Sequence, residues 1–207
     1  MKKLTQFTAV LSLIICVLSC SHSPLRKVEN SSIPFERPGY SILPPAGGDW
    51  KYYSDNSQGR FKLNFCKTIP DNRFHSLFVK AIETPNSATF ENPQEFEKWV
   101  KKTIEMAMNP NRLHLLDKKT ELDNNFGPYT VRYYTKSEDH GAVNRGNEPF
   151  LILVDYGYIF IHPSISNMLI WVSYSERGRS QDIRPDLKQA AELFFNGIEI
   201  TKKPSFN

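Results

Sequence analysis

The chain has 207 residues, a formal net charge of +4 and 40% hydrophobic residues. This length is enough for one domain with a sizeable core. Two lysines near the start, Lys2 and Lys3, supply half of the net charge, and no run of basic residues is longer than a pair. The composition therefore excludes the basic tracts that are typical of nucleic-acid-binding proteins.

The first twenty residues have the pattern of an export signal. Two lysines precede a largely apolar run, and the small residue Ser19 lies directly before Cys20. A positive start, a short apolar segment and a small residue at the cleavage point are typical of a secretory signal peptide. The apolar run is too short and too often interrupted for a transmembrane helix. We therefore expect a signal peptide over residues 1–19.

The end of this segment, Val17-Leu18-Ser19-Cys20, resembles the lipobox of bacterial lipoproteins. The resemblance implies that the chain is cut before Cys20 and that this cysteine carries acyl chains, such as palmitate, which hold it on a membrane. Two or three chains make the attachment practically permanent, since each buried methylene contributes about 0.8 kcal/mol. The alternative is an ordinary secretory signal in which the cysteine occurs by chance. Ser21, rather than Asp, follows Cys20, and this resembles the enterobacterial lipoproteins that are sorted to the outer membrane. We therefore expect a cell-envelope protein, on the outer membrane and facing the periplasm if the cell is Gram-negative.

The next segment is predicted to be a tether. Residues 20–38 are polar, contain three prolines and show no hydrophobic period. Such a composition is typical of a linker between an anchor and a domain. No internal repeat and no second linker follows, so residues 39–207 are expected to form a single domain.

Two helices are predicted in this domain. The first begins after Asn92, which can cap it, and stops at Asn109-Pro110. The second begins near Pro185 and stops at Asn196-Gly197. The first helix is amphipathic, because apolar residues recur at helical spacing. Its apolar face consists of Phe96, Trp99, Val100, Thr103, Ile104 and Ala107.

Strands make up most of the remainder. Consecutive strands favour antiparallel pairing, and two helices separated by a run of strands indicate an α+β fold with a mainly antiparallel sheet covered by two helices. The polar segment 137–148 is predicted to be a loop, and Gly157 to mark a bulge or a close approach. The expected strands lie at about 39–43, 59–67, 74–83, 112–122, 129–135, 150–161 and 168–176.

The order of these elements resembles the PsbP-like α/β/α-sandwich superfamily. The resemblance rests on the opening Gly39-Tyr40-Ser41-Ile42, on Trp50, on the mid-chain helix, on Gly157-Tyr158-Ile159-Phe160 and on the stretch from Val172 to Gly178. It covers about residues 39–200. It implies a sandwich fold and a role in protein binding or in the assembly of complexes, and it transfers no binding residue to this chain.

No metal site is expected from the spacing of the histidines. His75, His114, His140 and His162 are far apart, and the H-E-x-x-H motif is absent. His114 and Asp117 would lie on opposite faces of a strand. We therefore expect no metal ligand and no cofactor.

No catalytic residue is expected either. Ser175 and His162 could form a triad with Asp155 or Asp182, but the sequence has no G-x-S-x-G motif. Cys66 is the one cysteine left after signal removal and lipidation, so an internal disulfide is excluded. It is interpreted as a small packed side chain, with a reactive thiol as the alternative.

An aromatic row remains. Tyr156, Tyr158 and Phe160 alternate on one face of a strand, and His162 continues that face. The row is interpreted as core beneath a helix, and an exposed partner-binding surface is the alternative. The sequence as a whole favours a non-catalytic binding or assembly module with an envelope protein as partner. The alternative is a periplasmic hydrolase or small-ligand-binding enzyme that uses a cleft near residues 137–148.

Overall fold

The computed structural model describes residues 25–57, 59–143, 145–165 and 167–201. The predicted signal peptide and its lipid-attachment residue, Cys20, lie outside these described residues. Within them, no helix combines the length and the apolar character that crossing a membrane requires.

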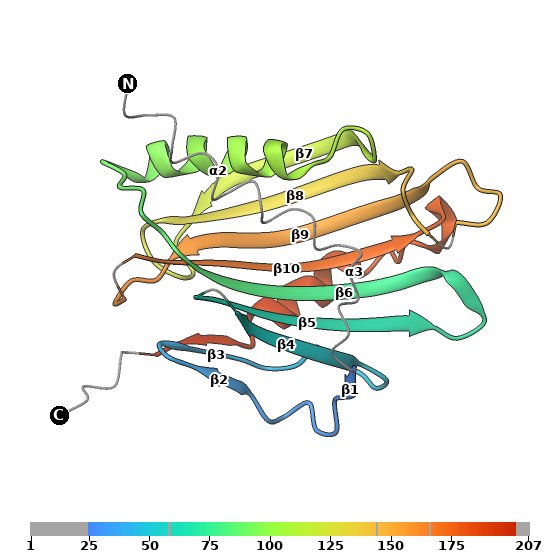
Figure 1. Cartoon of the computed structure of the whole chain (residues 1–207), viewed down its shortest axis with the longest axis horizontal. Helices are drawn as coiled ribbons and strands as arrows, with labels where there is room; N and C mark the ends of the chain where they lie inside the picture. Colours follow the sequence, from blue (N-terminus) through green and yellow to red (C-terminus); the bar gives the residue numbers. More distant parts are fainter. Residues whose placement is uncertain (1–24, 58, 144, 166, 202–207) are drawn as a thin grey trace.

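An eight-stranded antiparallel sheet forms the centre of the fold (Figure 1). In spatial order the strands are β1 (Arg26–Lys27), β4 (Lys51–Ser57), β5 (Arg60–Ile69), β6 (Asn72–Pro85), β10 (Met168–Gly178), β9 (Leu151–Ile161), β8 (Thr130–Asp139) and β7 (Leu113–Asp123). On one side of the sheet, β4, β5 and β6 are neighbours in chain order, and on the other side β7, β8, β9 and β10 are, so that β10 pairs with β6 in the middle. This confirms the antiparallel pairing that consecutive strands predict.

The two faces of this sheet carry different covers. Helix α2 (Pro93–Ala107) lies on one face and helix α3 (Leu187–Phe195) on the other (Figure 1). The short 3₁₀ helix η2 (Ser180–Asp182) precedes α3. A small second sheet packs into the same core as α3 and consists of β2 (Phe35–Arg37), β3 (Tyr40–Ile42) and β11 (Ile198–Ile200). We refer to the two sides as the α2 face and the α3 face, and the predicted α+β fold with two covering helices is confirmed.

Helix α2 forms as its sequence predicts. The side chain of Asn92 accepts a hydrogen bond from the backbone N–H of Glu95 at 2.9 Å, which satisfies a free donor of the first turn. The helix buries Phe96, Val100, Thr103 and Ile104 against the sheet. Trp99 differs, because it lies at the margin of the buried stripe. There it is half-buried and packs on Phe90 and Phe96.

The predicted tether is wrong over residues 25–38. β1 pairs with β4, and β2 pairs with β3, so both segments belong to sheets. The ring of Phe35 contacts Tyr52 and Phe65 at centroid distances of 4.8 and 5.4 Å, and Arg37 forms an ion pair with Glu83 at 3.2 Å. A strand of three residues is too short to show a hydrophobic period, so composition alone indicated a linker.

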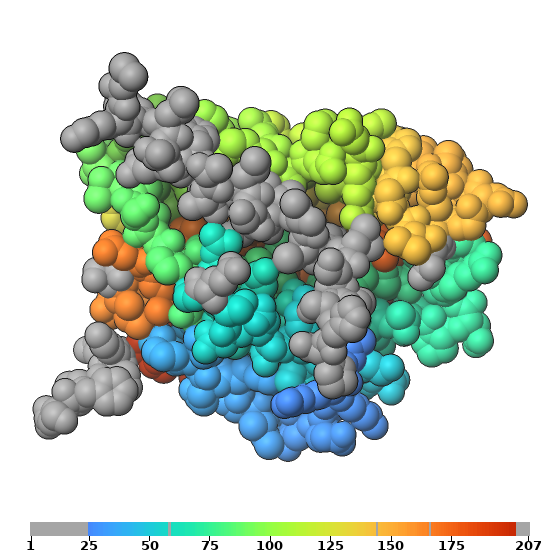
Figure 2. Space-filling view, in the orientation of Figure 1, coloured from blue at the N-terminus to red at the C-terminus, as the bar shows by residue number. Residues whose placement is uncertain are grey.

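The polar segment 137–148 is a loop only in its second part. β8 continues to Asp139, and the following residues project at one end of the molecule beside the β5–β6 turn (Figure 2). Glu148 forms an ion pair with Arg179 at 3.1 Å, and Arg145 donates a hydrogen bond to the carbonyl oxygen of Pro149. The ion pair ties the loop to the segment that follows β10, and the hydrogen bond closes the loop on itself.

Candidate functional site

A groove lies beside helix α2 on the face of the sheet that the helix covers only in part. The helix contacts β7 and β8, and the groove extends from there across β9, β10, β6 and β5. It consists of two cavities of about 180 and 110 Å³ that share Lys80, Leu153 and Asp155. We call this hollow the α2-face groove. Its apolar walls include Leu25, Phe78, Leu153, Ile104, Ala107 and Met108.

Small side chains explain why the sheet is hollow here. Strand register places residues from neighbouring strands in cross-strand rows on this face, since directly opposite residues point to the same side. Ser173 and Ser175 lie in the central strand β10, where longer side chains would fill the space. One row consists of Asn64, Lys80, Ser173, Gly157 and Tyr133, and the next of Cys66, Phe78, Ser175, Asp155 and Thr135.

A chain of three polar groups crosses the floor of the groove. The indole N–H of Trp171 donates a hydrogen bond to the hydroxyl of Tyr133 at 2.7 Å, and that hydroxyl donates to Oδ2 of Asp155 at 2.9 Å. The ring of Tyr133 lies against Gly157, where an added Cβ would come within 2.5 Å of two ring carbons and the hydroxyl oxygen. The close approach expected at Gly157 is therefore confirmed, and glycine is needed there to admit the tyrosine.

Asp155 is the unusual member of this chain. Burial raises the pKa of its carboxyl, while the positive charge of Lys80 and hydrogen bonding by Tyr133 and Ser173 act in the opposite direction. The second carboxyl oxygen, Oδ1, is buried and has no hydrogen-bond partner among the described residues. A buried acceptor without a partner is unfavourable by about 1–3 kcal/mol. Asp155 therefore carries a hydrogen-bond acceptor that no described residue uses at the floor of the groove.

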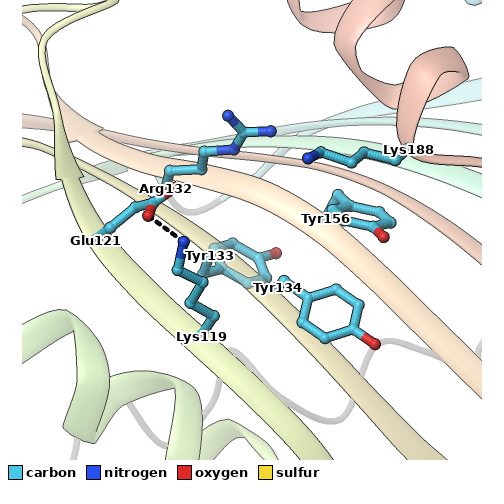
Figure 3. Close-up of a pocket in the computed structure, with 7 residues that line it drawn as sticks. All are labelled: Lys119, Glu121, Arg132, Tyr133, Tyr134, Tyr156 and Lys188. Carbon is cyan, nitrogen blue, oxygen red and sulfur yellow. Dashed lines mark ion pairs between the residues drawn. The ribbon is translucent and has the colours of Figure 1, made fainter.

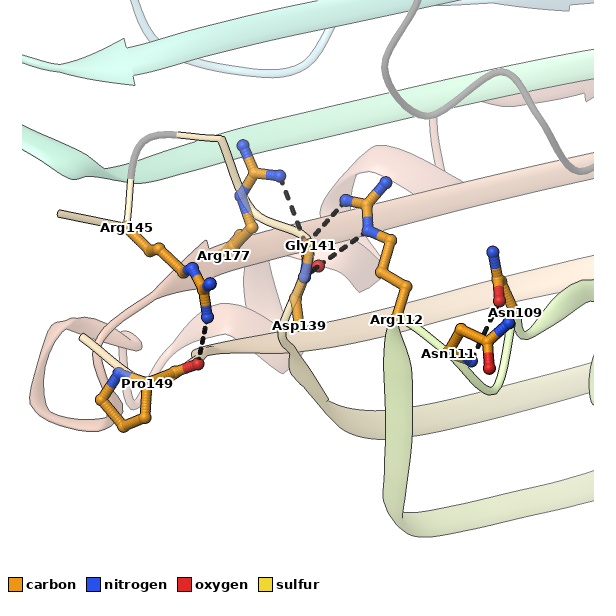
Figure 4. Close-up of polar contacts among 8 residues, drawn as sticks. All are labelled: Asn109, Asn111, Arg112, Asp139, Gly141, Arg145, Pro149 and Arg177. Carbon is orange, nitrogen blue, oxygen red and sulfur yellow. Dashed lines mark hydrogen bonds and ion pairs between the residues drawn. The ribbon is translucent and has the colours of Figure 1, made fainter. Parts of the chain in front are cut away.

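One end of the groove is closed by a second polar group. Asp139 is fully buried and accepts two hydrogen bonds from Arg112, at 2.7 and 2.8 Å, and a longer one from Arg177 at 3.4 Å (Figure 4). Burial raises the pKa of the Asp139 carboxyl, but the hydrogen bonds and charge of Arg112 outweigh this and hold it below its usual value. This carboxylate has its partners already, unlike Asp155, and its role is to fix the end of β8.

The residues considered for a catalytic triad do not assemble. Ser175 lies opposite Asp155 in the groove, but its hydroxyl donates to the carbonyl oxygen of Phe78 at 3.2 Å. His162 is buried on the α3 side, where Nε2 bonds the carbonyl oxygen of Gly39 at 2.7 Å. Asp182 caps η2 by accepting from the backbone N–H of Arg179. Hence Ser175 and His162 do not form a triad with either aspartate.

The histidines are arranged differently from expectation. His75 is buried and bonds Glu176 at 2.6 Å. His114 and His140, however, lie together with Glu138, although the histidines are widely spaced in the sequence. A bulge in β7 after Leu115 overturns the prediction for Asp117. Because one extra residue is inserted, His114 and Asp117 lie opposite Glu138 and Lys136, which share a face of β8.

The aromatic row is core over most of its length. Tyr158 and Phe160 are buried, and their rings contact Phe195 and Phe126 at centroid distances of 5.0 and 4.6 Å. This confirms the interpretation as core beneath a helix for both residues. Tyr156 is half-buried and lies beside Tyr134. Cys66, interpreted as a packed side chain, is half-buried in the wall of the groove.

A second hollow lies on the α3 face and is shown in Figure 3. It measures about 230 Å³, and Tyr134 and Tyr156 form its floor beside Lys188 of α3. Its charges are largely compensated, because Lys119 pairs with Glu121 and Arg132 with Glu192. The α2-face groove is the stronger candidate site, since it holds the buried acceptor without a partner.

Three residues of the groove, Lys80, Tyr133 and Trp171, were not found from the sequence. Each lies in a strand with an alternating pattern, and its spacing alone does not distinguish it from an ordinary core residue or an ordinary surface residue. The one available signal was Asp155, an acidic residue inside the strongly apolar segment 150–161.

Comparison with known proteins gives structural likeness only. No family model and no curated protein matches the sequence. Among solved structures, the chain is similar to LpqN of Mycobacterium tuberculosis, which is described as involved in cell envelope biogenesis. The two chains are 11% identical, the match covers 86% of this chain and 92% of LpqN, and the TM-score is 0.47. It is also similar to the cyanobacterial PsbP of Synechocystis sp. PCC 6803, with 13% identity, 89% and 99% covered, and a TM-score of 0.42. Neither likeness says what this chain binds.

Proposed function

We propose that the chain is a lipoprotein of the cell envelope that acts as a non-catalytic binding module. In this proposal Cys20 holds it on a membrane, and the α2-face groove receives an apolar side chain of a protein partner. The anchor is supported by the signal pattern of residues 1–19 and by the small residue directly before Cys20.

The observation that carries the binding role is the unpartnered oxygen of Asp155 inside an apolar hollow. Ligand sites are mostly apolar concave surfaces with a few convergent polar groups that fix orientation. Phe78 and Leu153 supply the apolar surface, and Oδ1 of Asp155 supplies the acceptor. An extended peptide fits this chemistry, because it offers an apolar side chain and a backbone N–H close together.

The arrangement supports binding over hydrolysis. Two of its polar groups are engaged elsewhere, since Ser175 is bonded to a backbone carbonyl and Asp139 to two arginines. The groove does reach Asp139 at the start of the loop near residues 137–148, but no observation adds a nucleophile and base to that end. We therefore retain the non-catalytic role.

The groove can be tested with a photoreactive amino acid at position 25, irradiated in intact cells, because Leu25 lines the groove and is exposed. We expect a discrete crosslinked adduct from position 25 and none from position 101, which lies on the exposed side of α2. Filling the hollow by Leu153→Trp should abolish the adduct. Adducts that are equal at both positions, or that persist in Leu153→Trp, would show that the groove is not the binding site.

The anchor has its own test. Metabolic labelling with a fatty acid should mark the wild-type protein and leave Cys20→Ala unlabelled. Cys66→Ala is the matched control, because that cysteine lies in the folded domain and should not affect lipidation. Labelling that survives in Cys20→Ala would contradict the anchor and leave the groove test unaffected.

A further inference from the structure

Three side chains on the α3 face offer ligands of the kind that bind transition metals. His114 of β7 lies directly opposite Glu138 of β8, so their side chains point to the same side of the sheet. His140 follows Glu138 by two residues and approaches the same side. One nitrogen or oxygen atom from each of the three residues lies within 4.8 Å of the others. We call this group the histidine cluster.

The contacts within the cluster converge on one carboxylate oxygen. Oε2 of Glu138 is 3.0 Å from Nε2 of His140 and 3.8 Å from Nδ1 of His114. The two imidazole rings lie 4.2 Å apart between centroids. Bonds from Zn²⁺ to nitrogen or oxygen measure about 2.0–2.2 Å, so bound ligand atoms are separated by no more than about 4.4 Å. Small side-chain rotations therefore bring all three atoms onto one ion.

The backbone that carries these ligands is fixed from the other face of the sheet. Asp139, between Glu138 and His140 in sequence, is clamped by Arg112 and also accepts from the backbone N–H of Gly141 at 3.1 Å (Figure 4). The backbone N–H of His140 donates to the carbonyl oxygen of Arg112 at 2.9 Å. The ends of β7 and β8 are thus tied together at the cluster, and positions of the ligands depend on side-chain rotation alone.

The cluster is accessible as well as fixed. The side chain of His114 is 55% exposed, and those of Glu138 and His140 are 24% and 31% exposed. An ion bound here keeps open positions for water or for a ligand atom from a partner. The buried histidines, by contrast, are engaged in the interior: His75 bonds Glu176. His162 bonds the carbonyl oxygen of Gly39 and accepts from the backbone N–H groups of Ser164 and Ile165.

We propose that His114, Glu138 and His140 form a binding site for a divalent transition-metal ion of the Zn²⁺ type. Two imidazole nitrogens and one carboxylate oxygen suit Zn²⁺, Cu²⁺, Ni²⁺ or Fe²⁺. Ca²⁺ and Mg²⁺ are disfavoured, because they take oxygen ligands almost alone. Three protein ligands with open positions form an incomplete shell, which suits a site that takes a further ligand from solvent or from another molecule.

The test is a Zn²⁺ titration of the untagged mature lipoprotein in detergent micelles after treatment with a chelator. We expect one equivalent of Zn²⁺ per chain. His114→Gln and Glu138→Gln should each weaken the affinity at least about tenfold. His22→Gln is the matched control, since it removes a histidine outside the described residues, and it should bind as the wild type does.

A second probe keeps the proposal falsifiable if one variant folds poorly. With Cu²⁺, electron paramagnetic resonance should show two coordinated imidazole nitrogens in the wild type and one in His114→Gln. The proposal is wrong if the folded wild type takes up no Zn²⁺, or if the cluster variants bind it with unchanged affinity. It is equally wrong if the Cu²⁺ spectra of wild type and His114→Gln are the same.

Discussion

The α2-face groove and the histidine cluster lie on opposite faces of the same sheet and are built differently. The groove depends on long-range packing, with a hydrogen-bonded chain from Trp171 through Tyr133 to Asp155 beneath helix α2. The histidine cluster depends on the register of two neighbouring strands and is largely exposed. Asp139 connects them, because it lines the groove while its sequence neighbours Glu138 and His140 face the other way. Groove variants should therefore change stability, and cluster variants should change metal affinity.

The largest effect is expected at the wall that α2 contributes to the groove. Ile104 is buried and lines the cavity. Ile104→Ala should lower the free energy of unfolding by about 2–5 kcal/mol, as truncation of a buried aliphatic residue does. Lys101→Ala, on the exposed side of α2, should change it by less than about 0.5 kcal/mol. Urea unfolding of the mature chain with Cys20→Ser measures both, and equal small effects would mean that α2 is not docked.

Arg112→Met should affect both regions. It removes the main partner of the buried Asp139 and leaves that carboxylate with Arg177 at 3.4 Å. Loss of one partner from a buried ion pair destabilises by about 3–5 kcal/mol, and we expect about 3 kcal/mol here because Arg177 remains. Zn²⁺ affinity should fall as well, since the end of β8 is released. An unchanged Zn²⁺ titration in a folded Arg112→Met protein would show that the two regions are independent.

Asp155→Asn tests the polar floor of the groove through its pH dependence. Burial raises the pKa of Asp155 above the unfolded value of about 3.9. Asp155 then holds its proton more strongly in the folded state than in the unfolded state. This group therefore disfavours folding increasingly as the pH rises from the unfolded pKa to the folded pKa. Asp155→Asn should therefore be more stable than the wild type at pH 7, because it removes a carboxylate whose ionisation disfavours the folded state.

That advantage should disappear as the pH falls below about 4, where the aspartate is protonated in both states. Asp186→Asn, at an exposed position before α3, is the matched control. Urea unfolding across pH 3 to 7 measures both variants. A stability difference between Asp155→Asn and wild type that did not change with pH would contradict a raised pKa.

The smallest effect on stability is expected in the histidine cluster. His114 is exposed and makes no contact with either core. His114→Gln should therefore change the free energy of unfolding by less than about 0.5 kcal/mol without metal. In excess Zn²⁺ the wild type should gain stability and the variant should not, because an ion that binds the folded state alone stabilises it. Equal thermal shifts in the two proteins would contradict the assignment of His114 as a ligand.

Much of the fold could be predicted from local pattern. Alternation found most of the long strands, and the cap at Asn92 with its apolar stripe found α2. The short strands β1 and β2 were missed, because two or three residues carry no period. β4 was missed too, since its residues are mostly polar and half-exposed at the edge of the sheet.

The sites were harder to predict, since both depend on register between strands. The hollow of the groove arises where Ser173, Gly157 and Asn64 fall into one cross-strand row, and no single strand shows this. Glu138 and His140 were assigned to a loop, so their common face was not anticipated. The extra residue in the β7 bulge then reversed the predicted relation of His114 and Asp117.

The most direct test of the groove as a binding site uses Cys66, which lines it. The rate of alkylation by a small maleimide is compared between the protein in intact cells and the purified lipoprotein. Lys101→Cys in a Cys66→Ser background is the control on the exposed side of α2. Occupancy of the groove predicts that Cys66 reacts at least about tenfold more slowly in cells while the control reacts equally in both settings. Equal rates for Cys66 in cells and in isolation would contradict the proposal.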